Sequence, residues 1–236
     1  MISCRALSMR YGAFCALDRL DLDIPQGEIC ALLGPNGAGK STTLKILAGL
    51  QQPTSGAATV AGRIPRDAKQ FTGVMPENLG LFEDLTVEEH LLLTADIYGA
   101  PRDRIGQLLR VLSLEKGRNT FASQCSHGMR KKTSFAMALL HSPQVLLLDE
   151  PFEAVDPVSA RMMFDLLRDA AQKGVTVFLT SHILSIVERL ADRFVLLRAG
   201  RIAHNERASG NLEQLYFELV ESPLTEKLEW LGSAQS

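Results

Sequence analysis

A glycine-rich segment near the start of the chain has the residue types and spacing that bind phosphate groups. Residues 34–41 match the pattern Gly-x-x-x-x-Gly-Lys-Ser/Thr and follow the apolar run Ile29–Leu33, which predicts a strand buried on both faces. Glycines allow backbone N–H groups to surround a phosphate, and the helix predicted after them points its positive end at the same anion. In this pattern Lys40 bridges the β- and γ-phosphates of a nucleotide, and the Ser41 hydroxyl is a ligand for Mg²⁺.

A pair of carboxylates supplies the second half of this chemistry. Val145–Leu148 predicts another buried strand, and Asp149 and Glu150 come directly after it. At the carboxyl end of such a strand, Asp149 is expected to face Mg²⁺ and Glu150 the attacking water. The glycine-rich segment alone leaves kinases, GTPases and ATPases open, so the residues downstream have to discriminate between them.

The elements that position these segments read as an α/β fold. Apolar residues alternate at the N-terminus, which predicts two antiparallel strands at a sheet edge. The residues expected on the shared apolar face are Ile2, Cys4 and Ala6 in the first strand and Leu20, Leu22 and Ile24 in the second.

The middle of the chain, roughly residues 76–124, reads as an α-helical insert. Thr86 and Glu89 form a capping box before an amphipathic helix, and a second helix is expected over residues 102–112. No apolar run in this stretch predicts a buried strand.

Helix and strand alternate again after the insert. Buried strands are expected at residues 175–180 and 194–197, and the helix before the first of them begins at the N-cap Asp156 and ends at Gly174. Short amphipathic helices are expected from about Asn211 onward.

Bulk properties narrow the function classes. The 236 residues suit one large domain, or one domain with a small subdomain, and the net charge of −2 gives no global attraction to nucleic acid. The four cysteines include no Cys-x-x-Cys pair, and the five histidines show no metal-ligand spacing, so a zinc site is not expected. The longest apolar run, residues 135–140, is far shorter than the about 20 residues of a membrane span. We therefore expect a cytosolic protein whose membrane role, if any, comes through a partner.

At this point the chain closely resembles the nucleotide-binding subunit of ABC transporters, from about residue 2 to about residue 220. Residues 126–129 read Ser-His-Gly-Met where the family has its signature Ser-Gly-Gly-Gln, immediately before a predicted helix. Residues 154–157 occupy the D-loop position, and His182 ends a strand as the family's switch histidine does. Tyr11 matches the aromatic position that stacks on adenine.

The resemblance implies a P-loop NTPase core with a mostly parallel sheet, an N-terminal antiparallel β subdomain and an α-helical insert. It implies one ATP-binding domain over residues 1–220, with the insert at about 78–140, and a tail at 221–236. It also implies that two subunits sandwich two ATP molecules head to tail, and that a membrane permease is the partner, with the protein held at the inner face of the cell membrane.

The site residues follow from the same resemblance. Those expected to hold ATP are Tyr11, Gly34, Pro35, Asn36, Gly37, Ala38, Gly39, Lys40, Ser41, Thr42, Ser126 and Gly128. Those expected to hold Mg²⁺ are Ser41, Asp149 and Glu77, and those expected to act in hydrolysis are Glu150, His182 and Lys40.

Three residues depart from the family pattern. His127 and Met129 replace a glycine and the glutamine of the signature, a variation typical of related exporter subunits. Glu77 stands where the family usually has the glutamine of the Q-loop, and its extra charge should change metal affinity and coupling. Residues 78–82, 85–91 and 211–217 also resemble single-domain exporter subunits, which favours export.

Two other functions remain open at this stage: a non-transport ABC ATPase, and a regulatory, weakly hydrolysing half of a heterodimer. The basic run Arg130-Lys131-Lys132 suggests nucleic acid, but the interpretation preferred here is a solvated face of the signature helix. His90, His141 and His204 are expected to be structural or surface residues.

Overall fold

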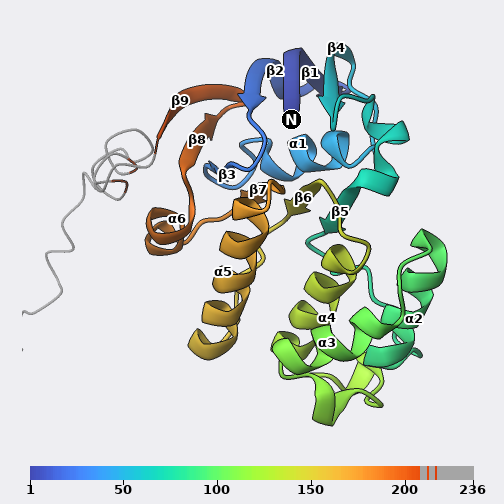
Figure 1. Ribbon diagram of the computed structural model, residues 1–236. Helices are drawn as coiled ribbons and strands as arrows, with labels where there is room; N and C mark the ends of the chain where they lie inside the picture. Colours follow the sequence, from blue (N-terminus) through green and yellow to red (C-terminus); the bar gives the residue numbers. More distant parts are fainter. Residues whose placement is uncertain (208–211, 213–215, 217–236) are drawn as a thin grey trace, which may run out of the picture.

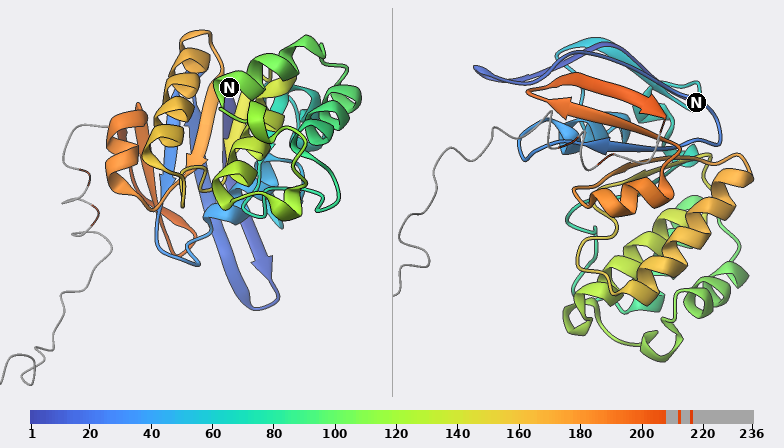
Figure 2. Two further views of the ribbon diagram at one scale, coloured as in Figure 1. Left: turned by 90° about the horizontal axis from the view of Figure 1, so that it is seen from below. Right: turned by 90° about the vertical axis from the view of Figure 1, so that its left-hand side faces the viewer.

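The computed structural model describes residues 1–207, 212 and 216, and it arranges them as two sheets stacked above a group of helices (Figures 1 and 2). A three-stranded sheet has the order β2-β1-β4, and a six-stranded sheet has the order β5-β6-β7-β3-β8-β9. The strands are β1 (Ile2–Tyr11), β2 (Phe14–Ile24), β3 (Ile29–Leu33), β4 (Ser55–Val60), β5 (Thr72–Met75), β6 (Val145–Leu148), β7 (Thr176–Thr180), β8 (Arg193–Arg198) and β9 (Arg201–Arg207).

The N-terminal sheet confirms the antiparallel pairing of the first two strands but corrects their pattern. β1 lies between β2 and β4, so it is a central strand of a separate sheet. Ala6 has a left-handed backbone, with φ of 46°, and it is exposed because the register shifts between Cys4 and Leu7. The expectation that Ala6 shares the buried face was therefore wrong, since a β-bulge at this point brings Leu7 inward instead.

The six-stranded sheet places the phosphate-binding segment at its centre. β3 pairs in parallel with β7 on one side and with β8 on the other, and all five of its residues are buried. β5, β6 and β7 continue the parallel order, while β9 pairs antiparallel with β8 at the edge. Strands buried on both faces explain why the central runs are continuously apolar.

The helices lie on the side of this sheet away from the N-terminal sheet, except α1, which lies between the two (Figures 1 and 2). They are α1 (Lys40–Leu47), α2 (Val87–Tyr98), α3 (Asp103–Val111), α4 (His127–Leu140), α5 (Pro157–Gln172) and α6 (Leu184–Leu190). Thr86 and Glu89 form the expected capping box, and Asp156 accepts hydrogen bonds from the N–H groups of Val158 and Ser159 at the start of α5. The Ser159 side chain and N–H also hold the pKa of the Asp156 carboxyl below its usual range.

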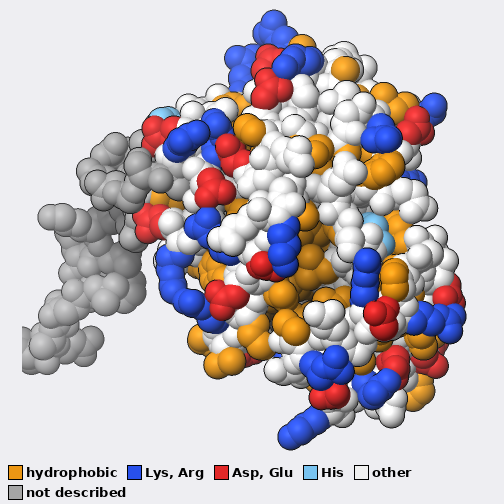
Figure 3. Space-filling model, viewed as in Figure 1, with side chains coloured by type: hydrophobic (Ala, Val, Ile, Leu, Met, Phe, Trp, Pro, Cys, Tyr) orange, Lys and Arg blue, Asp and Glu red, His pale blue; other side chains and the backbone are white. Residues whose placement is uncertain are grey.

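Helices α2, α3 and α4 form the insert, and their inner residues join the core beneath the sheet. Hydrophobic side chains gather at the centre of this side of the molecule, between α5 and the insert (Figure 3). Among the described residues, no helix combines the length and the apolar character needed to cross a bilayer. The expected C-terminal helices lie outside the described residues, except for Leu212 and Tyr216.

The basic run of α4 corrects the expectation of a solvated face. Arg130 is partly exposed, but Lys131 and Lys132 are only 3% and 9% exposed. Both side chains are buried although they belong to a basic run, and the Lys131 ammonium donates a hydrogen bond to the carbonyl oxygen of Glu150.

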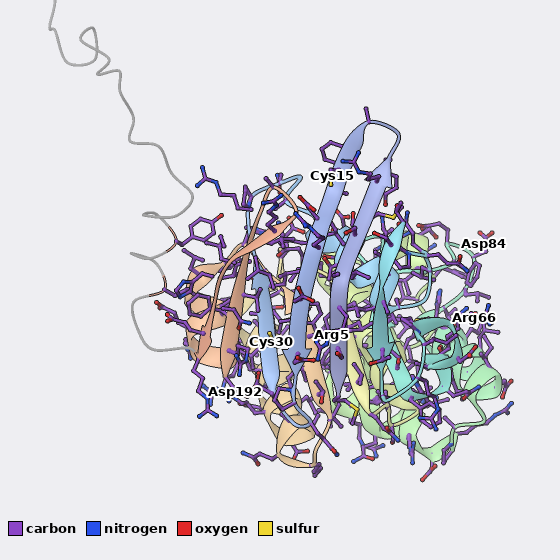
Figure 4. All side chains as sticks on the ribbon, turned by 90° about the horizontal axis from the view of Figure 1, so that it is seen from above. Arg5, Cys15, Cys30, Arg66, Asp84 and Asp192 are labelled. Atoms are coloured by element: carbon purple, nitrogen blue, oxygen red, sulfur yellow. The ribbon has the colours of Figure 1, made fainter. Side chains whose placement is uncertain are left out.

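The thiols divide between the interior and the surface. Cys4 and Cys30 are buried, and burial raises the pKa of both. Cys15 lies near the tip of the β1–β2 hairpin, while Cys30 lies on β3 (Figure 4). His90, which was expected to be a structural or surface residue, is fully buried. It accepts a hydrogen bond from the N–H of Phe82, which is a structural role.

The insert meets the sheet at a glycine. A Cβ atom on Gly73 of β5 would lie 2.0 Å from the carbonyl oxygen of Ala138 in α4, so only glycine allows this approach. The contact fixes how close α4 comes to β5 and β6, and hence the position of α4 side chains relative to the ends of those strands.

We expect Gly73→Ala to lower the free energy of unfolding by about 1–3 kcal/mol or more, because the added methyl group must displace backbone. The matched control is Gly106→Ala in α3, where the nearest atom to a new Cβ is the Arg110 side chain at 3.5 Å. That variant should be stabilised by up to about 1 kcal/mol, since alanine favours a helix. Urea unfolding of both variants measures the difference, and equal midpoints for Gly73→Ala and wild type would contradict the argument.

Candidate functional site

A cavity of about 490 Å³ lies where β3, β6 and β7 end. The carboxyl ends of parallel strands are where α/β sheets bind ligands. The residues that sequence analysis assigned to the site and that line this cavity are Gly34, Pro35, Asn36, Lys40, Ser41, Glu77, Asp149, Glu150 and His182. Segments more than 100 residues apart in the chain therefore meet at one place.

The phosphate-binding loop is shaped by its glycines and closed by its lysine. Gly39 precedes α1 with φ of 109°, and a Cβ there would lie 2.5 Å from the carbonyl oxygen of Ala16, so the position requires glycine. The Lys40 ammonium donates hydrogen bonds to the carbonyl oxygens of Gly34 (2.7 Å) and Pro35 (3.2 Å). The side chain thus lies across the loop, next to where phosphates would be surrounded by N–H groups of the loop.

The acidic side of the cavity is a hydrogen-bonded chain at the ends of β6 and β7. Asp149 is 6% exposed, and its Oδ1 accepts a 2.6 Å hydrogen bond from the Thr180 hydroxyl. Thr180 Oγ1 in turn accepts from the N–H of Glu150 at 2.9 Å. Glu150 has a left-handed backbone with φ of 47°, which a residue other than glycine adopts only when its surroundings hold it there.

The Glu150 carboxylate contacts His182. Glu150 Oε2 lies 2.9 Å from His182 Nδ1 and accepts a longer hydrogen bond of 3.3 Å from the His182 N–H. The His182 side chain is 53% exposed and that of Glu150 only 16%, so the histidine lies on the open side of the pair. The Glu150 carboxylate lines the edge of the cavity, which makes it the candidate base for an attacking water.

The charges of the cavity fit Mg²⁺ bound together with phosphate. Glu77, Asp149, Glu150 and Glu153 line it, with Lys40 as its only lysine or arginine among the described residues. A polyphosphate would be repelled by these carboxylates unless a cation accompanied it. Ser41, Asp149 and Glu77 offer oxygen atoms, the donors Mg²⁺ prefers, and Mg²⁺ is commonly held by one or two carboxylates plus substrate phosphates.

The other expected site residues lie outside the described lining of the cavity. They are Tyr11, Gly37, Ala38, Gly39, Thr42, Ser126 and Gly128. Tyr11 ends β1, is 46% exposed and donates a 2.7 Å hydrogen bond to Gln51. Ser126 caps α4 by accepting from the N–H of Met129, and Ser126 and His127 are exposed at the start of this helix.

Sequence reasoning missed two residues that line the cavity, Glu153 and Tyr216. Glu153 lies one turn after Glu150, and its N–H donates to the Glu150 carbonyl at 3.3 Å. A carboxylate three residues after a catalytic candidate is a signal that could have been used. Tyr216 follows β9 by several residues, and no local pattern connects it with the phosphate loop.

Comparison with known proteins gives a consistent result. Residues 17–153 match the family model described as ABC transporter. The Nod factor export ATP-binding protein I of Burkholderia orbicola is 37% identical over 208 residues, which cover 85% of this chain and 68% of that protein. The probable multidrug ABC transporter ATP-binding protein YbhF of Escherichia coli is 32% identical over 93% of this chain, which spans only 42% of that relative.

Solved structures agree with this comparison. A structure described as the ATP-binding subunit of an ABC transporter superimposes with a TM-score of 0.87 at 33% identity, covering 93% of this chain and 99% of that one. A dimeric bacterial ABC transporter cassette superimposes with a TM-score of 0.81 at 26% identity, covering 89% of this chain and all of that one.

Proposed function

Because this chain belongs to the ABC transporter family, as one of its ATP-binding ATPases, we propose that it is the motor subunit that powers transport through a separate membrane permease. The observation that carries the proposal is the convergence of Lys40, Asp149, Glu150 and His182 on one cavity from three different strand ends. A phosphate-binding group, a metal ligand and a candidate base in one place are the parts that ATP hydrolysis requires.

The residues divide the work of hydrolysis between them. Lys40 releases the loop carbonyls and binds the β- and γ-phosphates, while loop N–H groups hold the β-phosphate. Ser41, Asp149 and Glu77 would hold Mg²⁺, which would neutralise charge on the phosphate oxygens when bound. Glu150 takes the proton of the attacking water, and His182 keeps its carboxylate oriented. The close pairing of Glu150 and His182 favours a hydrolysing subunit over a purely regulatory one.

The signature residues act on a second subunit's nucleotide. Ser126 and Gly128 lie outside the lining of their own cavity, at an exposed helix N-terminus whose N–H groups favour an anion. Two ATP-binding subunits, identical or related, would close head to tail, so that Ser126 of each reaches the γ-phosphate held by the other. The dimeric cassette that this chain superimposes on supports the pairing of two such subunits.

Export is the direction we propose, because one relative is named for Nod factor export, while another is named for sulfate or thiosulfate import. The protein would then lie on the inner face of the membrane, bound through its permease. The test is phosphate release by the purified chain together with affinity purification from detergent-solubilised membranes. A polytopic membrane protein should co-purify and change the hydrolysis rate; a chain that neither hydrolyses ATP nor retains such a partner would contradict the proposal.

A further prediction concerns Glu77, which is exposed and lines the cavity beside Asp149. Its carboxylate attracts the cation and repels phosphate oxygens, and at a few ångströms each effect is about 1–4 kcal/mol, so the two nearly cancel in nucleotide affinity. We expect Glu77→Gln to shift the Mg²⁺ concentration for half-maximal hydrolysis and the stimulation by the permease, while metal-free nucleotide binding stays almost unchanged. This role would be contradicted if the Mg²⁺ titrations of Glu77→Gln and of the wild type were superimposable both with and without the membrane partner.

A further inference from the structure

A buried lysine of α4 reaches the hydrolytic centre from outside the cavity. Lys131 has a side chain that is only 4% exposed, and it does not line the described cavity. Its ammonium donates a 2.5 Å hydrogen bond to the carbonyl oxygen of Glu150. The sequence motifs of the site assign nothing to this residue, and neither does the proposed division of roles.

The Glu150 carbonyl is the main partner of this ammonium. The alternative partner, the Glu153 carboxylate, lies 3.8 Å away on a side chain that is 53% exposed, so solvent screens that pair. Burial lowers the pKa of Lys131, while the carboxylates of Glu153, Glu150 and Asp149 act in the opposite direction. The buried Lys131 ammonium therefore has the Glu150 carbonyl oxygen as its close hydrogen-bond partner.

Every polar group of Glu150 is held by a different element. Its N–H donates to Thr180 at the end of β7, and its carboxylate contacts His182 in the loop after β7. Its carbonyl accepts from Lys131 in α4 and from the N–H of Glu153. Glu150 has a left-handed backbone, with φ of 47°, which persists only when the surroundings hold it. The direction of its carboxylate therefore depends on the hydrogen bonds of both its N–H and its carbonyl group.

We propose that Lys131 is a positioning residue that fixes the Glu150 backbone and thereby aims the Glu150 carboxylate at the attacking water. This inference rests on the proposed ATP hydrolysis. Lys131 lies on the same helix as the signature residue Ser126, five residues after it and about 7.5 Å along the helix axis.

The test compares Lys131→Met, which keeps the stem and removes the donor, with Lys131→Arg, which keeps a donor. We expect Lys131→Met to lower kcat for ATP hydrolysis about 10- to 100-fold while the KM and the calorimetric affinity for ATP remain close to wild type. Lys131→Arg should recover part of kcat. The matched control is Arg130→Met on the same helix, whose guanidinium pairs with Glu83 on another side, and it should keep the wild-type kcat.

Two outcomes would overturn the inference. One is a wild-type kcat in Lys131→Met. The other is a parallel fall of kcat, ATP affinity and melting temperature that Lys131→Arg does not restore, which would show a general structural role.

Hydrogen exchange gives a readout that does not depend on activity. The backbone amides of Glu150, Phe152 and Glu153 should exchange about 10-fold faster in Lys131→Met than in wild type, and should exchange at the wild-type rate in Arg130→Met. Unchanged exchange in Lys131→Met overturns the inference whatever the hydrolysis assay gives. A wild-type chain that releases no phosphate would refute the proposed function instead, and the exchange measurement would still decide whether Lys131 holds Glu150.

Discussion

A Lys40→Ala variant should lose ATP binding and ATP hydrolysis together. The ammonium makes two hydrogen bonds within the loop, to the carbonyl oxygens of Gly34 and Pro35, so alanine removes both the bridge across the loop and the cation next to the phosphates. Hydrogen bonds to a charged group contribute about 1.5–3 kcal/mol each, which predicts an affinity at least about 10-fold lower.

Calorimetric titration of Mg²⁺ and ATP measures this effect directly. Lys45→Ala is the matched control, since Lys45 lies in the last turn of the same helix, is exposed and does not line the cavity. It should bind ATP like the wild type. An unchanged affinity in Lys40→Ala would mean that the cavity is not the phosphate site.

A Glu150→Gln variant should separate binding from chemistry. Glutamine keeps the shape and an oxygen that accepts from the His182 N–H, but it cannot take a proton from water. A positioned base contributes about 10²–10⁴-fold to rate, so turnover should fall by that factor while ATP still binds. Because hydrolysis would no longer reopen the paired subunits, a dimer of this variant should accumulate in the presence of ATP.

Phosphate release and size-exclusion chromatography with ATP test the two halves of this expectation. Glu115→Gln provides the control, because Glu115 is exposed in a short 3₁₀ helix (Glu115–Gly117) and does not line the cavity. Turnover of Glu150→Gln within a few-fold of the wild type would assign the base to another residue.

Local sequence predicted most of the elements because their signals are local. The continuous apolar runs of β3 and β6 and the caps at Thr86 and Asp156 depend on residues a few positions apart. The bulge at Ala6 and the strand β4 were not predicted. β4 reads Ser-Gly-Ala-Ala-Thr-Val, which has little apolar alternation, and it becomes a strand by pairing with β1.

The motifs of the candidate site could be predicted from the sequence, but the residues that hold those motifs in place could not. Residues 34–41 and 149–150 carry their chemistry in their order along the chain. The burial of Lys131 could not be read in the same way, because three consecutive basic residues are typical of a solvated face. Two of them, Lys131 and Lys132, are buried once α4 packs against β5 at Gly73. The strand order, with β3 between β7 and β8, is likewise a tertiary property.

That strand order has a consequence for biosynthesis. The phosphate loop is translated well before the strands that flank it, because β3 finds its strand partners only in residues 177–180 and 193–196. Until both segments have been translated, β3 lacks a strand partner on at least one side. Long-range pairing of this kind slows folding and leaves strand edges exposed to aggregation. ATP can therefore stabilise the finished protein, but not a growing chain in which β7 and β8 have not yet joined β3.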